Sequence, residues 1–239
     1  MKSIVVIIFL FLAHSSIQGQ SGEVIYSIKF NSENDSLLDK LGVKTFKEEL
    51  DEIAKDFRFK LSFNNTESQF NLIKNLFLND SDFKVKMAVR LYGRSSRFFT
   101  SLNDKFLIEE KEFLGRSFNV KTKFDDMKWI LTKESKTISG YTCFKAIGFR
   151  YSRDRNFKTK KYNVYAWYSP EIPINLGPFE AVGLPGLVLQ FDLIGQSLVV
   201  NKIDFKKEVV IDNPKDSKVI TKQEFDDMIK KRVETNKKN

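Results

Sequence analysis

The sequence predicts an α+β protein that is mainly antiparallel β: a curved antiparallel meander sheet with one helix from the N-terminal half and a C-terminal helix packed on it. Three observations lead to this fold class. Apolar and polar residues alternate with a period of two in several segments, as in half-buried antiparallel strands. Strand follows strand with few helical segments between them, which favours a meander over βαβ units. Aromatic residues make up 13% of the chain, with 23 Phe, and such residues suit the faces of a sheet.

The clearest alternation lies in residues 57–63 and 83–91. In the first, three Phe and a Leu alternate with Arg58, Lys60 and Ser62, and in the second, apolar residues alternate with Lys84, Lys86, Ala88 and Arg90. Both predict a strand with a basic outer face. Further strands are expected at residues 23–30, 97–102, 106–110, 117–124, 127–132, 140–151, 161–168, 187–193 and 197–205.

Two capping boxes predict where helices begin. Thr45 is followed three residues later by Glu48, and Thr221 by Glu224. In such a pair each side chain accepts a hydrogen bond from a backbone N–H group at the helix start. The first helix would bury its apolar residues at 46, 50 and 53, and the second those at 225, 228 and 229.

The N-terminus has the order of a cleavable signal peptide. Lys2 precedes an apolar run at residues 4–13, and small and polar residues follow as far as Gly19. The run is about ten residues, short of the roughly 20 that span a bilayer. We therefore expect residues 1–19 to be removed and residues 20–239 to form a single domain, soluble and without a transmembrane span. No Cys follows the run, so we expect an exported protein without a lipid anchor at a mature N-terminal Cys.

Composition excludes several classes of chemistry. The only histidine, His14, lies in the predicted signal peptide, so the mature chain lacks an imidazole for catalytic triads and for nearly all catalytic zinc sites. We expect no metal, no cofactor and no catalytic residue.

The single Cys143 stands between aromatic residues and is expected to be buried and unreactive. The net charge of +9 is spread along the chain, which favours solvated surface charge or anionic lipid headgroups over nucleic acid as a partner.

Four of the five prolines fall at residues 170–185, together with three glycines at 177–186. Proline fixes φ and glycine permits positive φ, so the segment should be a rigid, shaped loop between two strands. Leu184–Leu187 has Pro and Gly at the positions that a type II turn prefers. The loop is either a binding element or a structural clasp, and the sequence leaves both open. The candidate binding residues are Trp167, Tyr168, Pro170, Pro173, Gly183, Leu184, Pro185 and Gly186.

The motif Gly183-Leu184-Pro185-Gly186-Leu187-Val188 resembles the signature of the GLPGLI family, exported proteins of Bacteroidota, with Val188 in place of the family's Ile. The surrounding segments at residues 129–146 and 166–178, and the opening Gly22–Tyr26, are similar to the family's pattern. The resemblance implies a periplasmic or outer-membrane-associated protein, often encoded beside TonB-dependent receptors. It implies no catalytic residues.

Three functions remain open from the sequence. The first is a non-catalytic binding or accessory protein of the envelope, whose partner is an outer-membrane protein or an apolar ligand such as a lipid. The second is a protein-interaction module that uses sheet edges or the loop. The third is a carboxylate-using enzyme. Its only support in the sequence is three adjacent acidic pairs, at residues 109–110, 125–126 and 226–227. Neighbouring residues point apart on a strand or helix, whereas paired catalytic carboxylates face each other across a cleft.

Overall fold

The computed structural model describes residues 21–30, 44–73, 82–93, 97–153, 159–206, 208–214 and 219–236. The predicted signal peptide lies outside the described residues. The strands are β1 (Ser21–Phe30), β2 (Arg58–Phe63), β3 (Glu67–Leu72), β4 (Phe98–Ser101), β5 (Phe106–Phe113), β6 (Arg116–Lys123), β7 (Ile130–Ile138), β8 (Tyr141–Arg153), β9 (Thr159–Ser169), β10 (Leu187–Leu193), β11 (Gln196–Lys206) and β12 (Val219–Thr221). The helices are α2 (Lys44–Lys55), α3 (Phe83–Ala88) and α4 (Lys222–Asn236), with a π-helical segment at Val89–Gly93 and a 3-10 turn at Phe124–Asp126.

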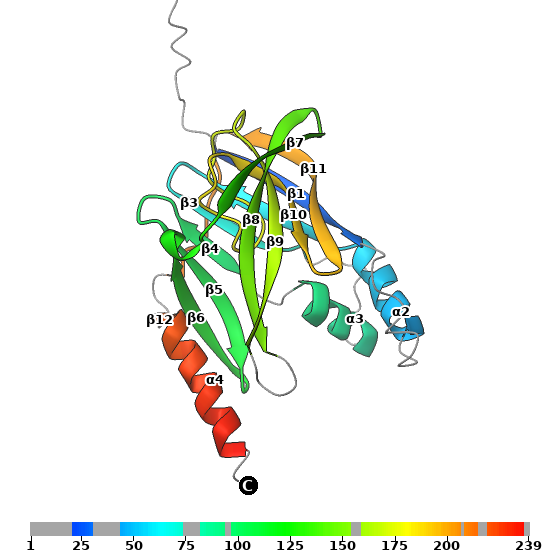
Figure 1. The fold of residues 1–239 in the computed structure, drawn as a ribbon, viewed down its shortest axis with the longest axis vertical. Coiled ribbons are helices and arrows are strands. Elements are labelled where there is room, and N and C mark those ends of the chain that lie inside the picture. Colours follow the sequence, from blue (N-terminus) through cyan, green and yellow to red (C-terminus); the bar gives the residue numbers. More distant parts are fainter. Residues whose placement is uncertain are drawn as a thin grey trace, which may run out of the picture.

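The strands form one open sheet in the order β12-β6-β5-β4-β3-β2-β1-β11-β10-β9-β8-β7. Two runs of sequential neighbours, β2 to β6 and β7 to β11, are joined through β1, which pairs antiparallel with both β2 and β11. Among the described pairs, β12 with β6 is the parallel one. The prediction of mostly antiparallel strands in one sheet with helices is therefore confirmed (Figure 1).

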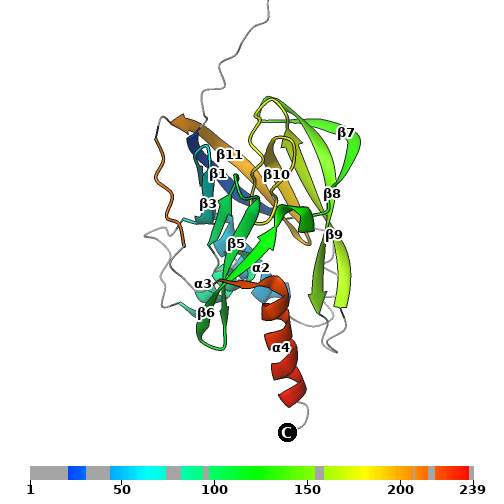
Figure 2. The same ribbon diagram turned by 90° about the vertical axis from the view of Figure 1, so that its left-hand side faces the viewer.

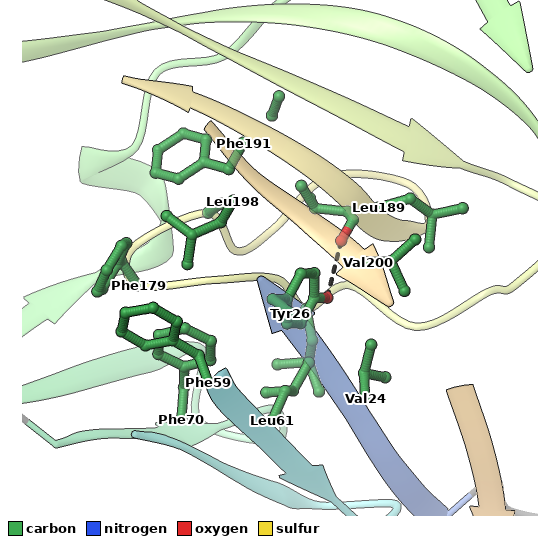
Figure 3. Packing of buried hydrophobic residues seen from close by; sticks show 14 of the residues in the cluster. Val24, Tyr26, Phe59, Leu61, Phe70, Phe179, Leu189, Phe191, Leu198 and Val200 are labelled. Atoms are coloured by element: carbon green, nitrogen blue, oxygen red, sulfur yellow. Dashed lines mark hydrogen bonds between the residues drawn. The ribbon is translucent and has the colours of Figure 1, made fainter. Parts of the chain in front are cut away.

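The core gathers side chains from strands far apart in the sequence. Phe59, Phe70 and Tyr26 from β1 to β3 lie near Phe191 and Leu198 from β10 and β11 (Figure 3), and all five are at most 2% exposed. Rings of Phe59 and Phe70 stack with centroids 5.7 Å apart. Several of the Phe residues therefore pack against each other in the core.

The prediction of a strand at residues 83–91 is wrong, because this segment forms α3 and the π-helical segment after it. The residues that it buries, Val85, Ala88 and Tyr92, recur with the three- and four-residue spacing of a helix. Phe83 and Leu91, which a strand would have buried, are 66% and 54% exposed. Asp82 caps the helix by accepting a hydrogen bond from the Lys84 backbone N–H at 2.7 Å.

Sequence reasoning also missed β3 and β12. The predicted capping box at Thr221 is confirmed, since Thr221 Oγ1 accepts from the Glu224 N–H at 3.2 Å and Glu224 Oε2 accepts from the Thr221 N–H at 2.7 Å. The capping box predicted at Thr45 is wrong, because α2 already includes Lys44 and so begins before Thr45. The helix α2 lies beside β1 and α3, whereas α4 lies beside β6 and β12 (Figures 1 and 2). Within the described part of the chain, no helix is both long and apolar enough to cross a membrane.

The turn at Leu184–Leu187 is tighter than the predicted type II turn. The Gly186 N–H donates to the Leu184 carbonyl at 2.8 Å, which closes a three-residue turn around Pro185. The Leu187 N–H donates instead to the Ile172 carbonyl at 2.9 Å, on the other limb of the loop. Gly186 does have positive φ, at 151°.

Candidate functional site

The strand β9 separates the predicted binding residues onto two faces of the sheet. Val164, Ala166 and Tyr168 are buried against the core, whereas Tyr165 and Trp167 are half-buried on the opposite face. Alternate residues of a strand point to opposite faces, so the adjacent Trp167 and Tyr168 cannot act on one ligand from the same side.

Trp167 lies in the middle of a cross-strand row. Its register partners are Lys145 on β8 and Gln190 on β10. The indole Nε1–H donates to Asp192 Oδ2 at 3.1 Å. The ammonium group of Lys136 on β7 lies 4.0 Å from the centre of the Trp167 ring, within the range of a cation–π contact. We call these five residues, Lys136, Lys145, Trp167, Gln190 and Asp192, the Trp167 face.

Hydrogen bonds between the polar members hold this face in place. Lys136 Nζ donates to Gln190 Oε1 at 2.9 Å, and Gln190 Nε2 donates to Asp192 Oδ1 at 2.6 Å. Partial burial lowers the pKa of the Lys136 ammonium group, and the nearby Asp192 carboxylate opposes that shift. Lys145 lies 4.7 Å from the ring centre of Tyr165, which extends the aromatic surface by one position along β9. The arrangement offers an aromatic ring with charged and amide groups around it, a composition common in binding surfaces.

The Pro/Gly loop between β9 and β10 has the structure of a clasp. Its apolar residues point into the core and are at most 7% exposed: Ile172, Ile174, Leu176, Phe179, Ala181, Val182 and Leu184. Of the other predicted binding residues, Gly186 is buried, whereas Pro170, Pro173, Gly183 and Pro185 are exposed. The eight predicted residues therefore do not form one site, and Trp167 alone belongs to the Trp167 face.

Phe179 shows how far the clasp reaches. Its ring lies 5.7 Å from Phe59, 5.1 Å from Phe70 and 5.6 Å from Phe98, in edge-on contacts with β2, β3 and β4. Its φ is 55°, an unfavourable value for a residue with a Cβ. The next residue, Glu180, forms an ion pair with Arg150 on β8, and both side chains are less than a fifth exposed. The clasp thus connects strands from both runs of the sheet.

Carboxylates of the adjacent acidic pairs are engaged in local contacts. Glu109 pairs with Lys111 at 3.0 Å, and Asp226 lies 3.4 Å from Lys222. Asp126 Oδ2 accepts from the Lys123 backbone N–H at 3.1 Å. Among the described residues, no cluster of three or more His, Cys, Asp or Glu side chains has the arrangement of a metal site.

Sequence reasoning missed Lys136, Lys145, Gln190 and Asp192. These residues lie on three strands, and only the strand register brings them next to Trp167. The register shifts between Val188 and Gln190 and between Leu131 and Ser135, so counting along the chain does not reveal the neighbours. The one available signal was that Gln190 and Asp192 are polar residues at alternate positions of an apolar strand.

Comparison with solved structures finds a protein with a similar fold. Two crystal structures of PNGF-II are similar to this chain, each at 12% sequence identity and each over 88% of this chain. The TM-scores are 0.51 and 0.48, and the matched region is 32% and 33% of the PNGF-II chain, respectively. The chain thus spans about a third of the length of those structures, and the likeness concerns the fold alone.

Comparison with family models gives a match to one segment of the chain. Residues 150–190 match a family described as "Protein of unknown function (Porph_ging)". This segment contains the end of β8, β9, the clasp and the start of β10. The match does not confirm membership in the GLPGLI family, which stays a prediction. No curated protein matches the chain.

Proposed function

We propose that this chain is a non-catalytic binding or accessory protein of the bacterial cell envelope, and that the Trp167 face is its contact surface. The proposal includes export with cleavage near Gly19, a periplasmic or outer-membrane-associated location, and a role beside a TonB-dependent receptor. It also includes a curved meander of residues 20–239 as the single domain that carries the face. The resemblance to the GLPGLI motif supports the location.

One observation carries the proposal. Trp167 stays half-buried on the outer face of the sheet, although Asp192, Gln190 and Lys136 fix its environment. Trp is enriched among the residues that dominate binding energy, and an indole held in one orientation loses little conformational entropy when a partner covers it. The Pro/Gly loop, which the sequence left open as a binding element or a clasp, buries its apolar residues in the core, and this burial supports the clasp interpretation.

Capture from the native envelope tests the proposal. The tagged mature protein and its Trp167→Leu variant are incubated with solubilised envelope, and bound proteins and lipids are identified by mass spectrometry. Leu keeps apolar bulk but removes the indole N–H and the flat ring. We expect a partner that the wild type retains and the Trp167→Leu variant loses.

The matched control is Phe83→Leu, which changes a 66% exposed aromatic residue on α3 to the same residue type. It should retain the partner at the wild-type level. Equal capture by wild type and Trp167→Leu would contradict the assignment of the face. Detection of the intact Met1 terminus in the envelope fraction would contradict export with cleavage.

The two alternative functions predict different results or require different structural features. A protein-interaction module that uses the sheet edge would lose its partner on changes to β7 and retain it in Trp167→Leu. A carboxylate-using enzyme would need two acidic groups facing each other in a cleft with shifted pKa values. The engaged carboxylates of the adjacent acidic pairs favour the binding proposal over this one.

A further inference from the structure

A groove lies between α4 and the hairpin of β5 and β6, away from the Trp167 face. Its volume is about 480 Å³, within the range of small-molecule sites. Figures 1 and 2 show α4 beside this hairpin in both views. The groove is lined by Phe113, Leu114, Arg116, Phe118, Met228, Lys231, Arg232 and Thr235.

The floor of the groove is built by an aromatic cluster. Phe225 of α4 is 5% exposed, and its ring meets those of Phe113 and Phe118 edge-on at 6.0 Å and 5.7 Å. These contacts fix the distance between the helix and the hairpin. Phe113, Phe118 and Met228 remain only half-buried and present apolar surface to the groove.

The rim of the groove carries charge of one sign. Arg116, Lys231 and Arg232 are exposed and line it, and no Asp or Glu is among the lining residues. Within the described part of the chain, no carboxylate forms an ion pair with any of the three. An apolar trough with three exposed cations at its edge is complementary to a molecule that has a hydrocarbon chain and an anionic head.

The tip of the β5–β6 hairpin adds an exposed apolar residue to the groove. Leu114 and Gly115 form a two-residue turn in which both have positive φ, 53° and 71°. Such turns prefer Asn or Asp followed by Gly, and a Leu in this conformation is strained. The Leu114 side chain is also 64% exposed at the groove. Leu114 therefore adds exposed apolar surface at the groove, which a hydrocarbon chain could cover.

We propose that this groove binds a single anionic amphiphile from solution, with its hydrocarbon chain along the apolar floor and under Leu114. Its anionic head lies at the basic rim formed by Arg116, Lys231 and Arg232. This site is separate from the Trp167 face, and the proposal does not depend on that face.

Isothermal titration calorimetry with the mature protein tests the site. The probes are dodecanoate below its micelle concentration, dodecanol with the same chain and no charge, and butyrate with the same head and a short chain. We expect dodecanoate to bind, dodecanol to bind about tenfold more weakly because it lacks the ionic contacts, and butyrate not to bind. No binding of dodecanoate would overturn the proposal.

Two variants separate the head site from the chain site. The triple change Arg116→Gln, Lys231→Gln and Arg232→Gln should weaken dodecanoate about tenfold and leave dodecanol nearly unchanged. The matched control replaces Lys86, Lys128 and Lys133, which do not line the groove, by Gln and should leave both affinities unchanged. If both triple variants weaken dodecanoate equally, general charge rather than the rim binds the head, and the assigned site is wrong.

Leu114→Asn tests the chain contact without harming the fold, since Asn tolerates the left-handed conformation. We expect its thermal stability to equal or exceed the wild type, while dodecanoate and dodecanol both bind a few-fold more weakly. Unchanged binding in this variant would overturn the role of Leu114.

A last experiment measures co-sedimentation of the protein with vesicles of anionic lipid. Vesicle binding without dodecanoate binding would show a membrane-docking surface in place of a site for a single amphiphile.

Discussion

The hydroxyl group of Tyr26 on β1 donates a hydrogen bond of 2.8 Å to the backbone carbonyl of Val188 on β10 (Figure 3). Both residues are fully buried, and burial raises the pKa of the Tyr26 hydroxyl well above its usual range. Val188 stands where the pairing of β10 with β9 shifts register, and its N–H donates to Leu176 of the clasp at 2.9 Å. Tyr26 thus provides the hydrogen-bond partner of a core carbonyl at an irregular point of the sheet.

Replacing Tyr26 by Phe should destabilise the protein by about 1–3 kcal/mol, because the Val188 carbonyl then stays buried without its partner. The ring itself is preserved, so packing changes little. Chemical denaturation measures the difference in the free energy of unfolding. Tyr151→Phe, at a 62% exposed position, is the control and should change it by less than about 0.5 kcal/mol. Equal stability of Tyr26→Phe and wild type would mean that water or a shifted backbone satisfies the carbonyl.

The ion pair between Arg150 and Glu180 connects the clasp to β8, and its loss should be costly. Arg150 also lies 6.0 Å from the ring centre of Phe179 and 5.6 Å from that of Phe191, and its Nη2 is buried without a hydrogen-bond partner. Glu180→Gln should destabilise the protein by about 2–4 kcal/mol, because the Arg150 charge remains in a largely apolar environment.

The double variant Arg150→Met with Glu180→Gln removes that charge and should be more stable than Glu180→Gln alone. Denaturation of the two single variants and the double variant gives the coupling free energy between the residues. Additive effects of the two changes would show that the pair is not coupled.

Glu23 on β1 makes stability depend on pH. Hydrogen bonds from Lys206 and from Lys60, the latter at 3.1 Å, lower the pKa of its carboxyl group below the ordinary value of 4.5. Because the folded-state pKa is below the unfolded one, the stabilisation is present above about pH 4.5 and is lost as the pH falls through the folded-state value. The wild type should therefore be more stable than Glu23→Gln at pH 7, and the difference should shrink at pH 3. A difference that is the same at both pH values would contradict the ionic origin.

The reactivity of the Cys143 thiol on β8 tests the burial that was predicted from the aromatic residues beside it. The thiol is fully buried, and burial raises its pKa to about 11. Since the thiolate is the reactive form, a thiol reagent at pH 8 should modify the folded protein far more slowly than the protein in denaturant. Labelling at the same rate in both states would show that the folded chain exposes the thiol.

The sequence predicted the sheet well where the two faces of a strand differ, as in β2 with Phe59, Leu61 and Phe63 on one side. The prediction failed at residues 83–91, because the apolar residues there fit both a strand period of two and a helical spacing. The structure forms the helix, which buries Val85, Ala88 and Tyr92. Asp82, a favoured N-cap residue directly before this segment, was a signal for the helix that sequence reasoning missed. Short β12 offered no period at all, because three residues cannot show one.

The candidate site was less predictable than the fold for a physical reason. Trp167 was identified as an aromatic residue beside a rigid loop, but its partners Lys136 and Asp192 depend on strand order and on two register shifts. The loop residues and Tyr168 were predicted as candidate binding residues together with Trp167. Strand alternation instead turns Tyr168 toward the core, and the clasp, which is not a strand, also buries its apolar residues there.

Gly183 and Gly186 both have positive φ, at 80° and 151°, yet they should respond differently to substitution. A Cβ at Gly186 would lie 2.1 Å from the carbonyl oxygen of Ser169, a backbone clash that no side-chain movement relieves. A Cβ at Gly183 would meet Phe124 at 3.6 Å, an ordinary contact. The left-handed preference of Asn should therefore rescue position 183 and not position 186.

We expect Gly183→Ala to destabilise the protein by about 1–2 kcal/mol, and Gly183→Asn by less, since only the backbone conformation is strained there. Gly186→Ala and Gly186→Asn should both be worse than Gly183→Ala and similar to each other, because displacement of Ser169 disrupts the pairing of β9 with β10. Pro185→Ala should be mild, about 0.4–1 kcal/mol, as it mainly frees the unfolded chain. Chemical denaturation of the five variants gives the order. A Gly186→Asn variant that is markedly more stable than Gly186→Ala would show that conformation, and not the contact with Ser169, requires glycine at the end of the clasp.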